Sequence, residues 1–174
     1  MRNALADDRA GRFSEGTSMS PTTAVTTTLH PGDVALGLRG DRLETLLGSC
    51  VAIVITDPRR TVGVMCHIVH SRPPSSAALA TGAYAEVALD TMVSLLQQRG
   101  ITARLCEAYV YGGGNMFPNL EQGPSVGDDN ADWALGALTT LGISVLAADV
   151  GGAAYRRLSW TVGRGAPQVV TTAV

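Results

Sequence analysis

Residues 45–55 read Thr-Leu-Leu-Gly-Ser-Cys-Val-Ala-Ile-Val-Ile, a small-residue turn that leads into a continuous apolar run. Such a run predicts a buried β-strand, which the turn at residues 48–50 separates from the apolar residues before it. A second apolar run covers residues 61–69, and only the turn signature at residues 57–60 lies between the two runs. Because this connection is so short, the two runs predict a β-hairpin.

Two helices are expected among further strands. Apolar residues recur at helical spacing over residues 81–99 and 129–141, and a glycine follows each stretch. Asp128 or Asp129 is expected to cap the second helix. The other predicted strands cover residues 103–111, 143–148, 155–162 and 168–172, of which the last two form a terminal hairpin. This mixture predicts an α/β fold, a sandwich whose two main helices pack on a largely antiparallel or mixed sheet.

The chain is long enough for one domain with a sizeable core, since it has 174 residues of which 45% are hydrophobic. Residues 1–28 differ from the rest because mixed charges lead into a Ser/Thr/Pro-rich stretch that has no apolar period. They are predicted to form a disordered N-terminal tail. Residues 29–174 are then expected to form the single folded domain.

Bulk properties argue against several classes of partner. The net charge of −2 disfavours binding to nucleic acid or to an anionic membrane. No apolar run approaches the roughly 18 residues of a membrane-spanning helix, and the N-terminus lacks the apolar core of a signal peptide.

The three cysteines are an odd number and do not suggest a disulfide framework. A reducing cytoplasm, where thiols stay free, is the expected compartment.

Cys50 and His67 form the candidate catalytic pair. The histidine follows the cysteine by seventeen positions and lies in the second apolar run, so the two side chains are expected on neighbouring strands. A thiol needs such a base because the thiolate is the nucleophile. Gly48 and Ser49 allow close approach of the backbone to a substrate, and amides of this turn are candidate oxyanion donors. The competing interpretation is a buried cysteine and a hydrogen-bonded core histidine.

Strand alternation separates some of the other candidate groups. In a regular strand Cys66 points to the opposite face from His67, and so does His70. No metal site is therefore expected at these residues, which also lack the usual ligand spacings. The glycines at residues 112–114 and 151–152 lack a phosphate-binding signature and are interpreted as tight turns at strand ends.

Four segments together resemble one known family, and they are residues 45–52, 63–67, 112–117 and 149–152. The Leu-Gly-Ser-Cys sequence and the spaced Met-Cys-His sequence are specific in combination, and Tyr84 and Arg156 also fit. The chain resembles the chemoreceptor glutamine deamidase family, CheD, from about residue 30 onwards. This resemblance implies a three-layered α/β sandwich similar to the catalytic domain of cytotoxic necrotizing toxins. It further implies cysteine-dependent hydrolysis of glutamine side chains without a metal or cofactor, with Cys50 as nucleophile and His67 as base.

The resemblance is incomplete at the third catalytic position. The family commonly has a threonine six residues before the cysteine, which is thought to orient the histidine. Glu44 occupies that position here, and a threonine follows at Thr45. We expect Glu44 to orient His67, and Thr45 in its place is the alternative. Only one of them can do so, because neighbouring strand residues face opposite ways. The family pattern also differs at Tyr109, where a lysine is usual, and at Asp129, where an arginine is frequent.

The implied partners are the cytoplasmic helices of methyl-accepting chemoreceptors, together with a CheC-type phosphatase. Two alternatives stay open at this point. One is a catalytically weakened family member that acts by docking to receptors or to such a phosphatase, which the change at Glu44 motivates. The other is an unrelated cysteine amidase of small substrates. Neither nucleic-acid binding nor membrane insertion is expected.

Overall fold

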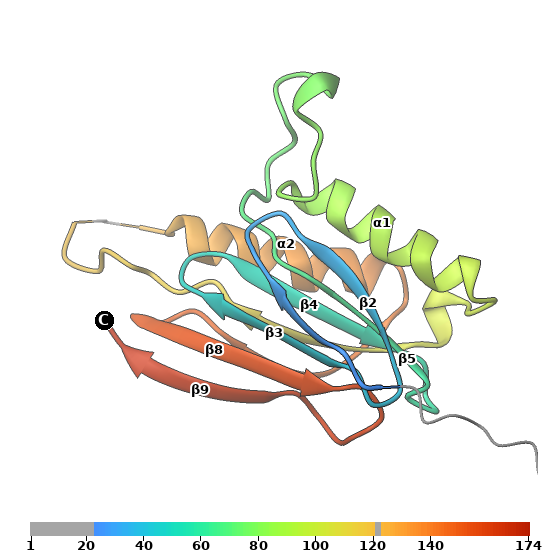
Figure 1. Cartoon of the computed structure of the whole chain (residues 1–174). Helices are drawn as coiled ribbons and strands as arrows, with labels where there is room; N and C mark the ends of the chain where they lie inside the picture. Colours follow the sequence, from blue (N-terminus) through green and yellow to red (C-terminus); the bar gives the residue numbers. More distant parts are fainter. Residues whose placement is uncertain (1–22, 121–122) are drawn as a thin grey trace, which may run out of the picture.

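The computed structural model describes residues 23–120 and 123–174, which form two β-sheets and a helical layer (Figure 1). The first sheet contains, in spatial order, β1 (Thr26–Leu29), β3 (Arg42–Leu47), β8 (Ala154–Thr161) and β9 (Gln168–Ala173). The second contains, in spatial order, β2 (Val34–Leu38), β5 (Val62–Cys66), β4 (Val51–Thr56), β6 (Glu107–Gly112) and β7 (Ser144–Val150). The helices are α1 (Ala85–Gln98) and α2 (Val126–Thr140), with short 3₁₀ turns at Ala77–Leu79 and Ala103–Leu105.

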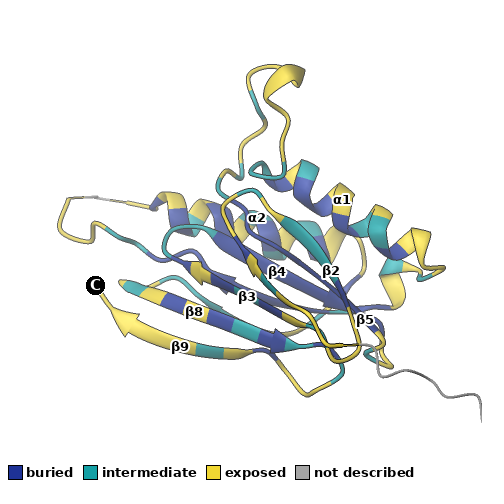
Figure 2. Cartoon of the chain, viewed as in Figure 1, coloured by how far each residue is buried: buried dark blue, intermediate teal, exposed yellow. Residues whose placement is uncertain are grey.

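The second sheet is the middle layer, because both of its faces are covered (Figure 2). All six residues of β4 are buried, which is why its sequence is a continuous apolar run. Val51, Ile53 and Ile55 pack in one core with residues of α1 and α2. Ala52 and Val54 pack in the other core, with residues of the first sheet. The predicted α/β sandwich is confirmed, and its three layers are sheet, sheet and helices.

The predicted boundary of the folded domain is wrong by a few residues. Thr26, Thr27 and Thr28 belong to β1, which pairs in parallel with β3, and Leu29 at its end is 2% exposed. The strand was not predicted because a threonine run has no apolar alternation. Threonine is β-branched, however, and β-branched residues favour a paired strand. Residues 1–22 of the expected tail lie outside the described residues.

The start of α2 also differs from expectation. The helix begins at Val126 after the N-cap residue Ser125, whose hydroxyl accepts a hydrogen bond from the backbone N–H of Asp128. The carboxylate of Asp128 accepts a hydrogen bond in return from the backbone N–H of Ser125 at 2.8 Å. Asp128 is therefore the third helical residue of a capping box rather than the cap itself.

No helix among residues 23–120 and 123–174 has both the length and the apolarity needed to cross a membrane.

Candidate active site

Cys50 lies in the turn between β3 and β4, beside the end of β5. Val51 and Ile68 exchange two backbone hydrogen bonds of 3.0 and 2.8 Å, which continues the antiparallel ladder of β4 and β5. In this register His67 lies opposite Ala52, which faces the core between the two sheets. Cys50, two residues before Ala52, packs against the same core. In this register the half-buried Cys50 and His67 occupy diagonal positions across the ladder.

His67 is held at both its backbone and its ring. Its N–H donates to the Asp33 carbonyl and its carbonyl accepts from the Gly32 N–H, each at 2.9 Å. The ring Nδ1 lies 2.8 Å from Thr45 Oγ1, and that hydroxyl donates its proton to the Leu29 carbonyl at 2.8 Å. A hydroxyl has one proton, so Thr45 must accept from Nδ1–H. The proton of neutral His67 is thus on Nδ1, which leaves Nε2 free to act as a base.

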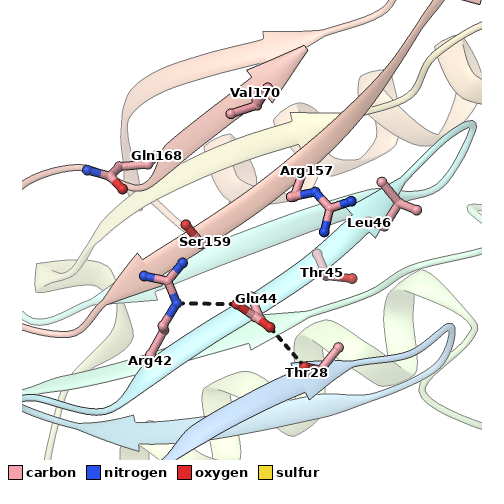
Figure 3. Close-up of a pocket in the computed structure, with 9 residues that line it drawn as sticks. All are labelled: Thr28, Arg42, Glu44, Thr45, Leu46, Arg157, Ser159, Gln168 and Val170. Carbon is pink, nitrogen blue, oxygen red and sulfur yellow. Dashed lines mark hydrogen bonds and ion pairs between the residues drawn. The ribbon is translucent and has the colours of Figure 1, made fainter. Parts of the chain in front are cut away.

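The expectation that Glu44 orients His67 is corrected by the structure, which brings Thr45 to the ring instead. Glu44 lies on the outer face of the first sheet and lines a hollow of about 340 Å³ (Figure 3). Its carboxylate accepts hydrogen bonds from Thr28 Oγ1 at 3.1 Å and from Arg42 Nε at 3.2 Å. Thr45 is the next residue of β3 and points to the opposite face, into the protein.

Thr45→Val should lower kcat about tenfold or more, while Glu44→Gln should leave it nearly unchanged. Valine keeps the shape of threonine but cannot hold the Nδ1 proton, and such a lost hydrogen bond is worth about 1–3 kcal/mol. Glutamine at residue 44 changes only an exposed pair. Steady-state kinetics of the two purified variants measures this, and a larger loss in the Glu44 variant would contradict the assignment.

The glycines at residues 112–114 support the Cys50 turn directly. Gly113 N–H donates to the Cys50 carbonyl and Gly114 N–H donates to the Gly48 carbonyl, each at 2.8 Å. At Gly112, where φ is +110°, a Cβ would lie 2.2 Å from the Cys50 carbonyl oxygen. The interpretation as a tight turn therefore covers only part of their role. These glycines let one backbone approach another behind the nucleophile.

Two further residues of this region were not singled out as structural supports from the sequence. Arg156 is buried and binds the Asp149 carboxylate at 2.9 Å and the Gly151 carbonyl at 2.8 Å, so it ties β8 to the end of β7. Asn130 on α2 donates to the carbonyls of Ser49 and Val69. Neither contact has a local sequence signature, because each joins elements that only the fold brings together.

The electrostatic environment favours a neutral pair at rest. Burial raises the pKa of the Cys50 thiol above its ordinary value of 9.0. Burial also lowers the pKa of His67 below 6.5, although its hydrogen-bonded contact to Leu29 and the charge of Asp33 oppose this. The thiol with a neutral imidazole is therefore favoured over a thiolate–imidazolium pair at rest. Burial raises the pKa of Cys66 to about 12 and that of Cys106 to about 11, so neither competes as a nucleophile.

Comparison with known proteins places this chain in a family. The family model described as CheD chemotactic sensory transduction matches residues 70–171, more than half of the chain. A protein of Albidiferax ferrireducens named probable chemoreceptor glutamine deamidase CheD 2 is 35% identical over 141 residues, which cover 79% of this chain and 82% of that protein. Probable chemoreceptor glutamine deamidases of Pseudomonas fluorescens and Methanococcus vannielii are 34% and 33% identical, over 79% and 72% of this chain and 79% and 81% of their own lengths. The chain belongs to the CheD family.

Proposed function

We propose that this chain is a protein-glutamine deamidase, which hydrolyses side-chain amides of glutamine residues in chemoreceptors and so regulates chemotaxis signalling. The observation that carries the proposal is the hydrogen-bonded chain from His67 through Thr45 to Leu29, which leaves Nε2 of the imidazole free, while the strand register puts Cys50 diagonally across the ladder from His67. The names of the relatives supply the substrate class. Cys50 is the nucleophile, His67 the general base and acid, and Thr45 a positioning residue.

The reaction follows from the neutral pair. His67 Nε2 takes the thiol proton as Cys50 Sγ forms a bond to the carboxamide carbon of the glutamine. Backbone amides of the turn that contains Gly48, Ser49 and Cys50 stabilise the oxyanion. The tetrahedral intermediate breaks its C–N bond, and His67 gives the proton to the departing ammonia. Water then attacks the thioester with His67 again as base, which releases glutamate and restores the thiol.

The pH dependence of kcat/KM should be a broad plateau. The reaction needs a neutral His67 and a protonated Cys50. Because the pKa of His67 is lowered from 6.5, the acid limb should lie below pH 6.5, and because that of Cys50 is raised from 9.0, the alkaline limb should lie above pH 9. A stopped assay with a receptor fragment across this range measures the profile. A narrow optimum near pH 6 would instead indicate a thiolate–imidazolium pair.

Incubation with the cytoplasmic fragment of a methyl-accepting chemoreceptor tests the proposal. Mass spectrometry of the digested fragment should find glutamine converted to glutamate by the wild-type chain and not by Cys50→Ala. Cys66→Ala is the matched control, since this second cysteine lies in the core on the helical side of the sheet. Equal conversion by wild type and Cys50→Ala would overturn the proposal, and so would hydrolysis of free glutamine alone.

The docking alternative was motivated by the replacement of the family's threonine by Glu44. It loses that motivation, because the neighbouring Thr45 contacts the His67 ring. A CheC-type phosphatase as partner and a cytoplasmic location stay predictions. Copurification with such a phosphatase, compared between the wild-type chain and Cys50→Ala, would test docking separately from catalysis.

A further inference from the structure

We infer that Asn130 is a positioning residue, which replaces a missing rung of the β4–β5 ladder and thereby sets the placement of Cys50 relative to His67. This inference rests on the proposed function for its kinetic readout. The reactivity of the Cys50 thiol supplies a second readout that needs no receptor.

The side-chain amide of Asn130 makes three hydrogen bonds, which use both of its N–H donors and its oxygen. Its Nδ2 donates to the Ser49 carbonyl at 3.1 Å and to the Val69 carbonyl at 3.0 Å. Its Oδ1 accepts from the Ser71 N–H at 2.8 Å. The residue is 1% exposed. An amide offers two donors and an acceptor, so no other uncharged side chain of this size could make the same set.

The bridge lies where the backbone ladder stops. Beyond the pair Val51 and Ile68, an antiparallel ladder would next join Ser49 to His70 by two hydrogen bonds. The N–H groups of Val69 and His70 instead donate to the Ala83 carbonyl at 2.9 and 3.0 Å. The strands therefore separate at the nucleophile, and the Asn130 amide joins the two carbonyls across the gap.

Both bridged carbonyls belong to the segments that hold the reacting groups. The Ser49 carbonyl is part of the peptide bond to Cys50, and Val69 follows His67 by two residues. Rotation of the Ser49–Cys50 peptide would move the thiol relative to the imidazole. Asn130 opposes that rotation from one side, while the Gly113 N–H opposes it from the other by binding the Cys50 carbonyl at 2.8 Å.

The position of Asn130 is itself fixed by the start of α2. The capping box of Ser125 and Asp128 defines the first turn of the helix. Gly127 in that turn packs so closely on the glycine loop that a Cβ would lie 2.4 Å from the Gly113 carbonyl oxygen. The start of α2 therefore carries Asn130, which supports the Cys50 turn directly, and also packs on the glycine loop that supports the turn from Gly113.

Asn130→Ala and Asn130→Asp test the inference, with Leu138→Ala as the control. Alanine removes all three hydrogen bonds and suits a helix, so this variant should fold. Aspartate keeps the shape and the acceptor for Ser71 but loses the amide donors. Leu138 is fully buried two turns later on α2 and does not contact the turn's carbonyls, so its truncation lowers the melting temperature without touching the site.

In both Asn130 variants kcat on the receptor fragment should fall about 100-fold, with KM within about twofold of wild type, because misplacement of reacting groups affects the chemical step. The rate of Cys50 alkylation by iodoacetamide should fall as well, read by mass spectrometry of the Cys50 peptide. Leu138→Ala should keep both rates at a temperature where it is folded.

Three results would overturn the inference. The first is an unchanged alkylation rate and kcat in folded Asn130→Ala. The second is an equal loss of kcat and alkylation rate in Leu138→Ala, and the third is unfolding of both Asn130 variants. Either of these would mean that Asn130 has only a general stabilising role. Should the wild-type chain fail to deamidate any receptor, the alkylation rates alone still decide whether Asn130 positions the thiol.

Discussion

His67→Gln should lower kcat on a receptor fragment by about 10²–10⁴-fold, the usual contribution of a positioned general base. Glutamine can still bond to Thr45, but it has no group that takes up the thiol proton near neutral pH. The rate of Cys50 alkylation by iodoacetamide should fall in parallel, because the thiol, whose pKa burial raises, then has no base beside it.

His70→Gln is the matched control for this variant. His70 is only three residues away, but its ring packs against Tyr84 in a tilted arrangement with ring centroids 5.0 Å apart, and it takes no part in the Thr45 contact. Steady-state kinetics and thiol labelling should find this variant close to wild type. A larger loss in the His70 variant than in the His67 variant would reassign the base.

Gly127→Ala should destabilise the fold by about 1–3 kcal/mol or more, although alanine is ordinarily the better helix former. A Cβ at this residue would lie 2.4 Å from the Gly113 carbonyl oxygen and 2.5 Å from that of Gly114. Both contacts are backbone atoms of the loop that supports Cys50, so they cannot move aside without moving the turn. Turnover should therefore fall together with stability.

Gly136→Ala provides the opposite result on the same helix. A Cβ there meets nothing within 4 Å, so alanine should raise the free energy of unfolding by up to about 1 kcal/mol. Urea unfolding of the two variants, compared at equal m-values, measures both effects. Stabilisation by both alanines would show that the glycine loop yields easily and is no rigid support for the nucleophile.

Much of the middle layer could be predicted from the sequence because its signals are local. The apolar run of β4 and the short turn after it define a hairpin whose register follows from alternation. The same alternation separates His67 from Cys66, and the structure indeed places Cys66 in the core on the helical side. The cysteine turn could also be located, since small residues between two apolar runs have few other uses.

The remaining parts of the site depend on contacts between distant segments. Asn130 lies 81 positions from Ser49 and 61 from Val69, and nothing in its own neighbourhood indicates either partner. The choice between Glu44 and Thr45 depends on which face of β3 points inward. That face is decided by pairing with β1 and β8, and three of the four residues of β1 were expected to be disordered.

Trapping of the acyl-enzyme tests the central claim most directly. If Cys50 forms a thioester with the substrate, hydroxylamine added during turnover should compete with water and convert the target glutamine into its γ-hydroxamate. Mass spectrometry of the receptor fragment should find this hydroxamate with wild type, in an amount that rises with hydroxylamine concentration, and none with Cys50→Ala. Formation of glutamate without any hydroxamate, or of hydroxamate by Cys50→Ala, would contradict covalent catalysis by Cys50.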